Sequence, residues 1–350
     1  MTLRSNIIRA GFDALYFSGA HYLLRPILAG VGVILMLHHV RPARSDPFQP
    51  NRHLEVTPEF LRTTLDHVRE LGLDIIGVDE MHRRMAAREF SRRFVCFTFD
   101  DGYRDNRDFA LPVMREHDAP FTVYAAGDFV DGRGQFWWLA LEQLVAKAEV
   151  IDAPIGDGVR LDAGSPAAKQ AAFDRLHPWL RAMPSDEAMM DALRTLGAPH
   201  GLSADAAGRD LCMPWDELRD FAADPLVTIG AHTLSHCTLA KASRAVAAHE
   251  MAASRKRIED ALQRPVRHFA YPYGDKIAAT AREFTLAREL GFSTAVTTRP
   301  GMLFAENASH LTALPRISLN GHFQDRRFLS VLTSGAATAI WKGFRRVDAA

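Results

Sequence analysis

Two aspartates that follow a buried stretch have the chemistry of a catalytic site. The segment "FVCFTFDDGY" (94–103) begins with six apolar or β-branched residues, and Asp100 and Asp101 come directly after them. Adjacent carboxylates repel each other, and their desolvation at the end of a buried run is costly. The pair is expected either to hold a cation and act on a substrate, or to form an ordinary turn or helix cap.

Two histidines offer matching ligands. The segment "GAHTLSH" (230–236) is the only place in the chain where two histidines stand four residues apart. On a helical turn, the imidazoles of His232 and His236 would lie on one face, a common metal-binding geometry. With 15 histidines in the chain this spacing also arises readily by chance, so it gains weight mainly from its position after a predicted strand.

One carboxylate and two imidazoles make a three-ligand site with room for water or substrate. This is the pattern of a catalytic divalent metal ion rather than of a closed structural one. We expect one aspartate to hold the ion and the other to take a proton from the water that the ion activates.

The segment "FAYPYGD" (269–275) predicts a rigid turn near these residues. Pro272 restricts the backbone and Gly274 permits a tight approach. A backbone N–H in this turn, such as that of Tyr273, would be able to stabilise a tetrahedral oxyanion. An ordinary turn at the end of a strand is an equally good interpretation of these residues alone.

The elements that must position these residues alternate along the chain. Apolar, β-rich segments predict strands at 31–37, 73–81, 94–99, 120–126, 225–233, 266–274, 292–298 and 314–321. Helices are expected among them at 57–72, 108–118, 243–263 and 280–290. Such alternation predicts a parallel α/β fold of the (β/α)-barrel type, in which the site lies at the carboxyl ends of the strands. The aspartates, the histidines and the proline turn all fall at such ends.

Residues 131–215 interrupt the alternation and are expected to form a mainly helical insertion with no obvious chemistry. The predicted organisation is an amphipathic extension at 1–30, a barrel at 31–330 and a tail at 331–350.

Composition excludes several classes of function. Lys plus Arg and Asp plus Glu both number 42, so no net charge attracts nucleic acid, and we expect no nucleic-acid partner. The three cysteines, Cys96, Cys212 and Cys237, form no metal-binding spacing and no disulfide framework, which fits a reducing compartment.

The amino-terminal region shows no apolar core followed by a cleavage site, so we expect a cytoplasmic protein. The apolar run 26–37 is too short to cross a bilayer. Residues 5–17 predict an amphipathic helix, either resting on a membrane surface or packed on the protein itself. The segment 339–347 leaves the same two alternatives open, so peripheral membrane contact is one of them.

Together, these motifs resemble those of the polysaccharide deacetylases of the NodB-homology type, carbohydrate esterase family 4. "TFDDGY" resembles the first motif of that family, "HTLSH" the second, and "FAYPYG" a variant of the third. "LMLHHV" and "LPRIS" are also similar to segments of one branch. The resemblance covers roughly residues 33–130 and 213–320. It implies a distorted (β/α)7 barrel and metal-dependent removal of N-acetyl groups from amino sugars.

The resemblance also implies roles for individual residues. Asp100 would be the catalytic base, and the Tyr273 backbone N–H would bind the oxyanion. Pro272 and Tyr273 would form the substrate-binding turn. The divalent metal ion, usually zinc in this family, would have three ligands: Asp101, His232 and His236.

The chain departs from the family pattern in two places. Many members carry an arginine in the third motif, where this chain has Ala270 and Tyr271. Many also supply the general acid from a late Leu-x-His motif, and neither His310 nor His322 stands in a clean one. His38, after the first strand, is the better candidate for the acid, with a loop or capping role as the alternative.

Arg316 either orients a carboxylate of the site or forms a surface ion pair. A structural or exposed role is expected for seven other histidines: His39, His67, His82, His117, His177, His249 and His268.

A cytoplasmic enzyme does not meet finished cell wall, so the expected N-acetylated substrate is a chitooligosaccharide, or an exopolysaccharide or lipid-linked intermediate. Two alternatives stay open: a hydrolase of a non-sugar amide, and a catalytically inactive carbohydrate-binding barrel.

Overall fold

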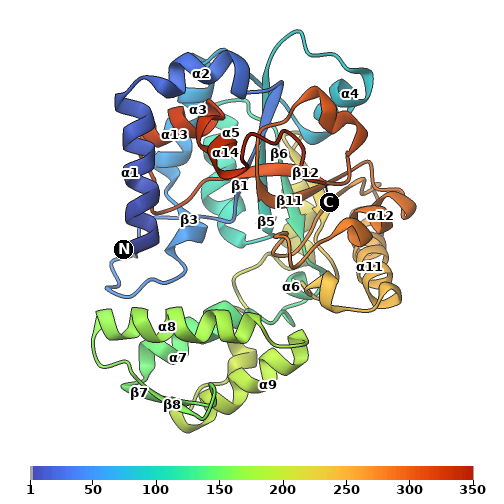
Figure 1. Ribbon diagram of the computed structural model, residues 1–350. Helices are drawn as coiled ribbons and strands as arrows, with labels where there is room; N and C mark the ends of the chain where they lie inside the picture. The colour runs from blue at the N-terminus through green and yellow to red at the C-terminus, as the bar shows by residue number, and fades with distance from the viewer. Residues whose placement is uncertain (1–2, 350) are drawn as a thin grey trace.

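The computed structural model describes residues 3–349 and has a closed ring of seven parallel strands at its centre (Figure 1). The strands follow the order β1-β12-β11-β10-β9-β6-β5, and β1 pairs with β5 to close the ring. This arrangement confirms the predicted (β/α)7-type barrel. Its strands are β1 (Gly32–Leu37), β5 (Phe94–Asp101), β6 (Phe121–Ala125), β9 (Val227–Ala231), β10 (His268–Ala270), β11 (Thr294–Pro300) and β12 (Leu314–Ser318).

Helices surround the ring and bury the outer faces of its strands. Every residue of β1 and β5 is buried, as expected when helices cover one face and the barrel interior fills the other. The surrounding helices are α3 (Pro58–Glu70), α4 (Val78–Ala87), α5 (Leu111–Glu116), α10 (Trp215–Ala222), α11 (Arg244–Leu262), α12 (Ala281–Glu289) and α13 (Arg326–Thr333).

The register of the strands brings the predicted site residues to one rim. Leu37 of β1 is paired with Phe99 of β5, so the residues that follow each of them emerge side by side. Asp101 at the end of β5 is paired with Ala125 of β6, and Ala125 with Ala231 of β9. His232, one residue beyond β9, therefore emerges two strands from Asp101.

The expected strand at 73–81 is wrong in extent. Only β4 (Asp74–Ile75) is extended, and it pairs with β5 outside the closed ring. The rest of the segment begins α4, which starts at Val78 with Asp79 and Glu80 in its first turn. Acidic residues there favour a helix start through the helix dipole, and this outweighs the short apolar pattern.

The insertion forms a layer with its own apolar cluster below the barrel in the view of Figure 1. It contains the helices α7 (Trp137–Lys147), α8 (Pro166–Arg181) and α9 (Asp186–Gly197). It also contains an antiparallel hairpin that the sequence analysis did not anticipate, β7 (Val150–Ala153) with β8 (Val159–Asp162).

The two ends of the chain form helices that pack together on the barrel. These are α1 (Leu3–Phe17), α2 (Ala20–Leu28) and α14 (Ala336–Trp341). Phe12 of α1 is buried, with ring centroids 5.3 Å from Phe323 and 5.4 Å from Phe328. One face of α1 therefore packs on the protein, and α13 spans the boundary that the sequence analysis placed at residue 330. In the described part of the chain, no helix combines the length and apolar character needed to cross a bilayer.

Candidate metal and active site

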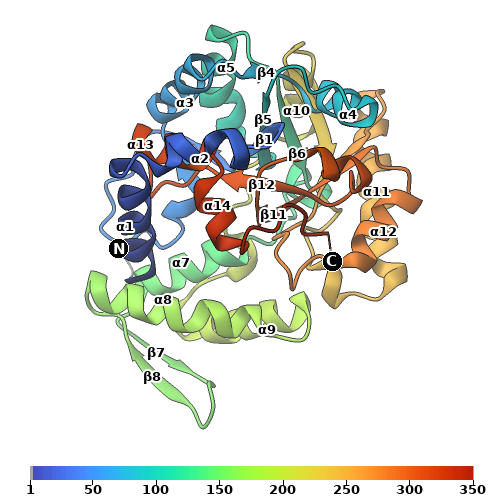
Figure 2. The same cartoon turned by 45° about the horizontal axis from the view of Figure 1, so that its top comes forward.

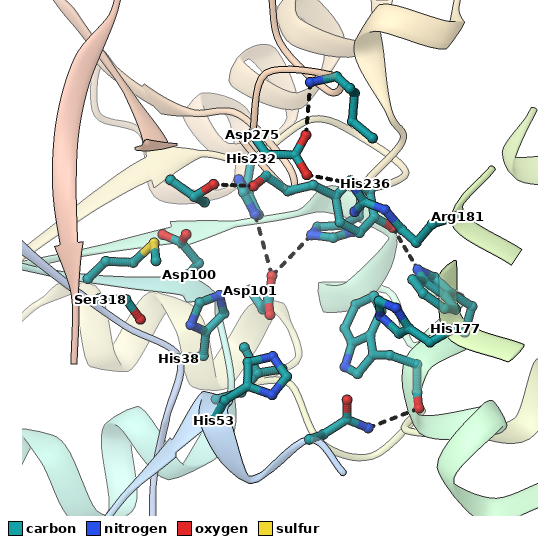
Figure 3. A pocket seen from close by; sticks show the side chains of 18 of the residues that line it. His38, His53, Asp100, Asp101, His177, Arg181, His232, His236, Asp275 and Ser318 are labelled. Carbon is teal, nitrogen blue, oxygen red and sulfur yellow. Dashed lines mark hydrogen bonds and ion pairs between the residues drawn. The ribbon is translucent and has the colours of Figure 1, made fainter. Parts of the chain in front are cut away.

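Three predicted ligands meet at the carboxyl end of the barrel. Asp101 Oδ1 lies 3.4 Å from His232 Nε2 and 3.3 Å from His236 Nε2 (Figure 3). All three side chains are buried, and one ligand atom from each lies within 4.8 Å of the others. The structure thus brings together the carboxylate and both imidazoles that the sequence singled out.

The chemistry of these donors fits a cation. His232 Nδ1 donates to the Ala270 carbonyl at 2.7 Å, which fixes the ring so that Nε2 faces Asp101. Asp101 Oδ1 is buried without a hydrogen-bond partner among the described residues. Buried lone pairs that face one another are unfavourable unless a cation lies between them, and carboxylate and imidazole suit a divalent ion such as zinc.

The helical turn expected for the histidine pair is wrong. His232 leaves the end of β9, where its N–H donates to the Ala125 carbonyl at 3.1 Å, and the segment that follows is an irregular loop. Thr233 and His236 have φ values of 62° and 59°, a region that side chains other than glycine rarely adopt. Two residues with left-handed backbone conformation, Thr233 and His236, bring the imidazoles together, and helical periodicity does not.

Two carboxylates outside the motif hold this loop. Glu250 of α11 accepts from the Leu234 and Ser235 backbone N–H groups, both at 2.9 Å. Asp186 of α9 accepts from the Thr238 N–H at 2.6 Å and from its hydroxyl at 2.9 Å. The insertion therefore supports the loop that carries the two histidines directly. The sequence carries no local signal for either carboxylate.

The second aspartate has a different partner. Arg316 of β12 donates to both oxygens of Asp100, at 2.7 and 2.6 Å, and is fully buried. Burial by itself would raise the pKa of Asp100, but the Arg316 charge and hydrogen bonds lower it below its ordinary value. Of the two alternatives for Arg316, the structure therefore selects the one in which it orients a carboxylate.

His38 lies beside Asp101 on the cavity wall (Figure 3). Asn106 fixes its backbone by donating to the His38 carbonyl at 2.8 Å. Burial lowers the pKa of His38 to about 4, against the opposing effect of Asp101 and Asp100. A neutral imidazole at neutral pH must first accept a proton before it can act as an acid. Its role as general acid remains a prediction, and neither His310 nor His322 lines this cavity.

The proline turn presents a free backbone donor. Tyr273 has a φ of 60°, and its N–H has no hydrogen-bond partner among residues 3–349. The Tyr273 hydroxyl accepts from Trp137 Nε1 at 2.9 Å, and its ring lies against His236 at 4.9 Å. Pro272 is buried and is not part of the cavity wall, so it acts on the backbone of the turn and does not offer a surface to substrate.

These groups line a cavity of about 610 Å³ whose far wall comes from the insertion. The insertion, for which the sequence indicated no chemistry, and His177, for which a structural or exposed role is expected, both border this cavity. Consecutive aromatic residues in "FWW" were the one available signal. The insertion contributes Trp137, Trp138, His177, Pro178, Arg181 and Ala182, and His53 faces them from the loop before α3.

Comparison with known proteins agrees with this geometry. A family model described as polysaccharide deacetylase matches residues 87–295. None of the curated proteins matches the chain at a significant level.

Several solved structures share the fold. The deacetylase PplD of Streptococcus pyogenes, solved in complex with acetate, is 18% identical with a TM-score of 0.55, and the match covers 83% of this chain and 92% of that one. IcaB from Ammonifex degensii is 17% identical with a TM-score of 0.53, covering 87% and 97% of the two chains. The BpsB deacetylase domain from Bordetella bronchiseptica is 18% identical with a TM-score of 0.50, covering 82% and 95%.

At these identities the solved structures establish the shared fold alone. The family model is the stronger finding, because residues 87–295 make up more than half of the chain and include both aspartates and both histidines. This chain belongs to the polysaccharide deacetylase family.

Proposed function

We propose that this protein is a metal-dependent N-deacetylase that releases acetate from N-acetylated amino sugars of an oligo- or polysaccharide. The observation that carries the proposal is the buried cluster of Asp101, His232 and His236 next to an aspartate held by Arg316. Amide hydrolysis needs a water nucleophile, a base and a stabilised oxyanion, and this rim offers a group for each.

Asp101, His232 and His236 would hold the ion. A divalent cation bound there supplies Lewis-acid polarisation of the acetamide carbonyl and of the attacking water. Asp100 accepts the proton of that water, since the two hydrogen bonds from Arg316 keep the carboxylate ionised and fixed in direction. The Tyr273 N–H donates to the oxygen that becomes negatively charged.

The leaving amine needs a proton. His38 is neutral at neutral pH, so the proton that Asp100 removes from water is the source from which His38 would be charged. His38 and Asp100 line the same cavity, and His38 would then donate to the amine as it leaves.

The cavity supports a saccharide over a small non-sugar amide. Trp137, Trp138 and Tyr273 line it, and aromatic faces stack on the apolar faces of sugar rings. Its one arginine, Arg181, is engaged by Asp275 at 2.7 Å and does not stand free to bind an anion. We propose a chitooligosaccharide, or an exopolysaccharide or lipid-linked intermediate, as substrate, and a cytoplasmic site of action.

The test is acetate release from N-acetylglucosamine oligomers. Chelated protein is compared with protein given back zinc, cobalt or nickel, and bound metal is measured by elemental analysis. We expect metal-restored release and one bound ion per chain. Binding of metal and sugar without release would contradict the proposal and favour a carbohydrate-binding barrel, and release only from non-sugar acetamides would favour the other alternative.

Two variants separate the proposed roles. Asp100→Asn keeps its metal and loses about 10²–10⁴-fold in kcat, because only the proton acceptor is removed. His236→Gln loses metal and activity together. Near-full activity of Asp100→Asn would rule out Asp100 as the base.

A further inference from the structure

The exposed apolar side chains of this protein gather on one surface. Among the described residues, nine of the twelve large apolar side chains that are exposed belong to α1, α2, α14 or the residues just after α14. We call this the terminal-helix surface, and its most prominent members are Phe17, Tyr22, Leu23, Ile27, Trp341 and Phe344. Apolar side chains scattered singly need no explanation, but a cluster of this kind marks an interaction site.

The helix α2 has no cover on its outer side. None of its nine residues is buried, and Tyr22, Leu23 and Ile27 are 71%, 73% and 64% exposed. Its inner side lies against α14 and α1, and Figure 2 shows the three helices side by side. This contrasts with α1, whose Phe12 is buried against the barrel helices. The terminal helices are therefore packed against the protein, and they still expose apolar side chains to solvent.

Positive charge borders the apolar side chains. A crevice of about 220 Å³ between α2 and the residues after α14 is lined by Ile27, Phe344, Lys342, Arg345 and Arg346. No acidic residue occurs at 14–45 or at 326–347.

Two acidic residues lie near the cations of this crevice. Glu306 pairs with Arg346 at 3.1 Å, and Asp348 pairs with Arg299 at 3.2 Å and with Lys276 at 3.2 Å. Arg345 has no ion-pair partner in the part of the chain that the structure describes. The crevice keeps an excess of positive charge.

We propose that the terminal-helix surface binds a membrane rich in anionic lipid. Apolar side chains insert at the boundary between headgroups and acyl chains, and cations beside them attract anionic headgroups. Tryptophan and tyrosine favour this boundary because they combine an apolar ring with a polar group. A second copy of the chain fits the surface poorly, because a twofold contact would bring two positively charged crevices together, and Glu306 and Asp348 already pair with cations of their own chain.

The fold determines how the catalytic cavity would face when the terminal-helix surface is bound to a membrane. The helix α2 enters β1 at Gly32, where the barrel strands begin, whereas the catalytic cavity lies where they end. The residues that line the cavity and those of the crevice do not overlap. A membrane-bound molecule would therefore present its active site away from the lipid surface, toward saccharide that extends from it.

Vesicle sedimentation tests the proposal with the full chain. Phosphatidylcholine vesicles are compared, at low and high salt, with vesicles in which about 30% of the lipid is phosphatidylglycerol, which gives them a negative surface. We expect binding to the anionic vesicles at low salt only. Brominated lipid should quench tryptophan fluorescence in the native chain and much less in Trp341→Phe, because the four other tryptophans belong to α7, α8 and α10.

Matched variants identify the surface. Leu23→Ser with Ile27→Ser, and separately Arg345→Gln with Arg346→Gln, should weaken binding, the latter by about fivefold for each charge removed. Val246→Ser on α11, an apolar residue that is 50% exposed, is the control and should bind as the native chain does. All variants should keep native acetate release from soluble oligomers.

The outcomes exclude one another. Absence of vesicle binding, or equal binding by the Leu23/Ile27 variant, would overturn the proposal. A dimer in solution that Leu23→Ser dissociates, with no vesicle binding, would show that a second copy covers the surface instead. Because these readouts are independent of catalysis, their result does not depend on the proposed deacetylation.

Discussion

Asp100 and Asp101 are neighbours in sequence, but their side chains contact different residues. Asp100 is joined to Arg316 and Asp101 faces His232 and His236. Successive side chains of a strand point to opposite sides, and Asp101 adds a φ of 77° that turns it further. Two adjacent buried carboxylates repel each other. Each therefore has its own partner: Arg316 offsets the charge of Asp100, and the two imidazoles face Asp101.

Removal of Arg316 should destabilise the protein more than removal of the whole pair. Arg316→Leu leaves the buried Asp100 carboxylate without its partner, and such a loss costs about 3–5 kcal/mol. The double variant Arg316→Leu/Asp100→Asn should recover much of that stability and remain inactive. Urea unfolding measures both, and an unchanged midpoint for Arg316→Leu would contradict a buried ion pair.

The turn that carries Tyr273 requires glycine at position 274. Gly274 has a φ of 56°, and a Cβ there would lie 2.6 Å from the Thr298 backbone nitrogen. We expect Gly274→Ala to displace the Tyr273 N–H and reduce kcat by about 10²-fold.

Gly72→Ala is the matched control for this prediction. Gly72 has a φ of 70° with nothing within 4 Å of a Cβ, so alanine there should cost only backbone strain, about 1–2 kcal/mol, with normal kcat. Thermal unfolding and acetate release measure both effects. Equal kcat in the two variants would show that the turn does not position a catalytic donor.

At the scale of elements, the insertion holds the loop that carries His232 and His236 through Asp186 of α9. Asp186→Ala removes both acceptors of Thr238, so the loop that carries His236 should loosen. We expect metal affinity to fall by about 10–100-fold, as for other residues that orient metal ligands.

Asp191→Asn is the control on the same helix. Asp191 pairs with Arg194 at 2.7 Å on the exterior and does not touch the loop. Metal titration by calorimetry compares the two variants. Native affinity in Asp186→Ala would mean that the loop keeps its conformation without the insertion.

At the scale of the whole molecule, buried histidines make stability depend on pH. His67 lies between α3 and α13, and burial, with Arg326 and Arg25 nearby, lowers its pKa from 6.5 to about 4. Between these values the unfolded chain binds the proton and the folded chain does not. Stability from this group is therefore complete above pH 6.5 and declines as the pH falls toward 4.

We expect the free energy of unfolding to fall by about 1–3 kcal/mol on account of His67 between pH 7 and 4. His67→Gln should flatten this slope, and His249→Gln, at an exposed position on α11, should leave it unchanged. Denaturant unfolding at several pH values measures the slopes. Parallel slopes for His67→Gln and the native chain would contradict a buried neutral imidazole.

The sequence by itself determined the barrel class and singled out two aspartates and two histidines as candidate ligands. Alternating strands and helices predict parallel βα units, and both aspartates and both histidines were singled out because they come at the ends of predicted strands. The choice of Asp101 over Asp100 as the ligand came from the family resemblance. These are local features, and local periodicity is what a sequence displays directly.

Only the tertiary structure decided which distant groups complete the site. Arg316 reaches Asp100 across 216 positions, and Asp186 reaches Thr238 from the insertion. The insertion closes one wall of the cavity, and the histidine loop adopts left-handed backbone in place of a helical turn. Such contacts depend on how packed elements meet in space, and side-chain spacing along the chain carries no record of them.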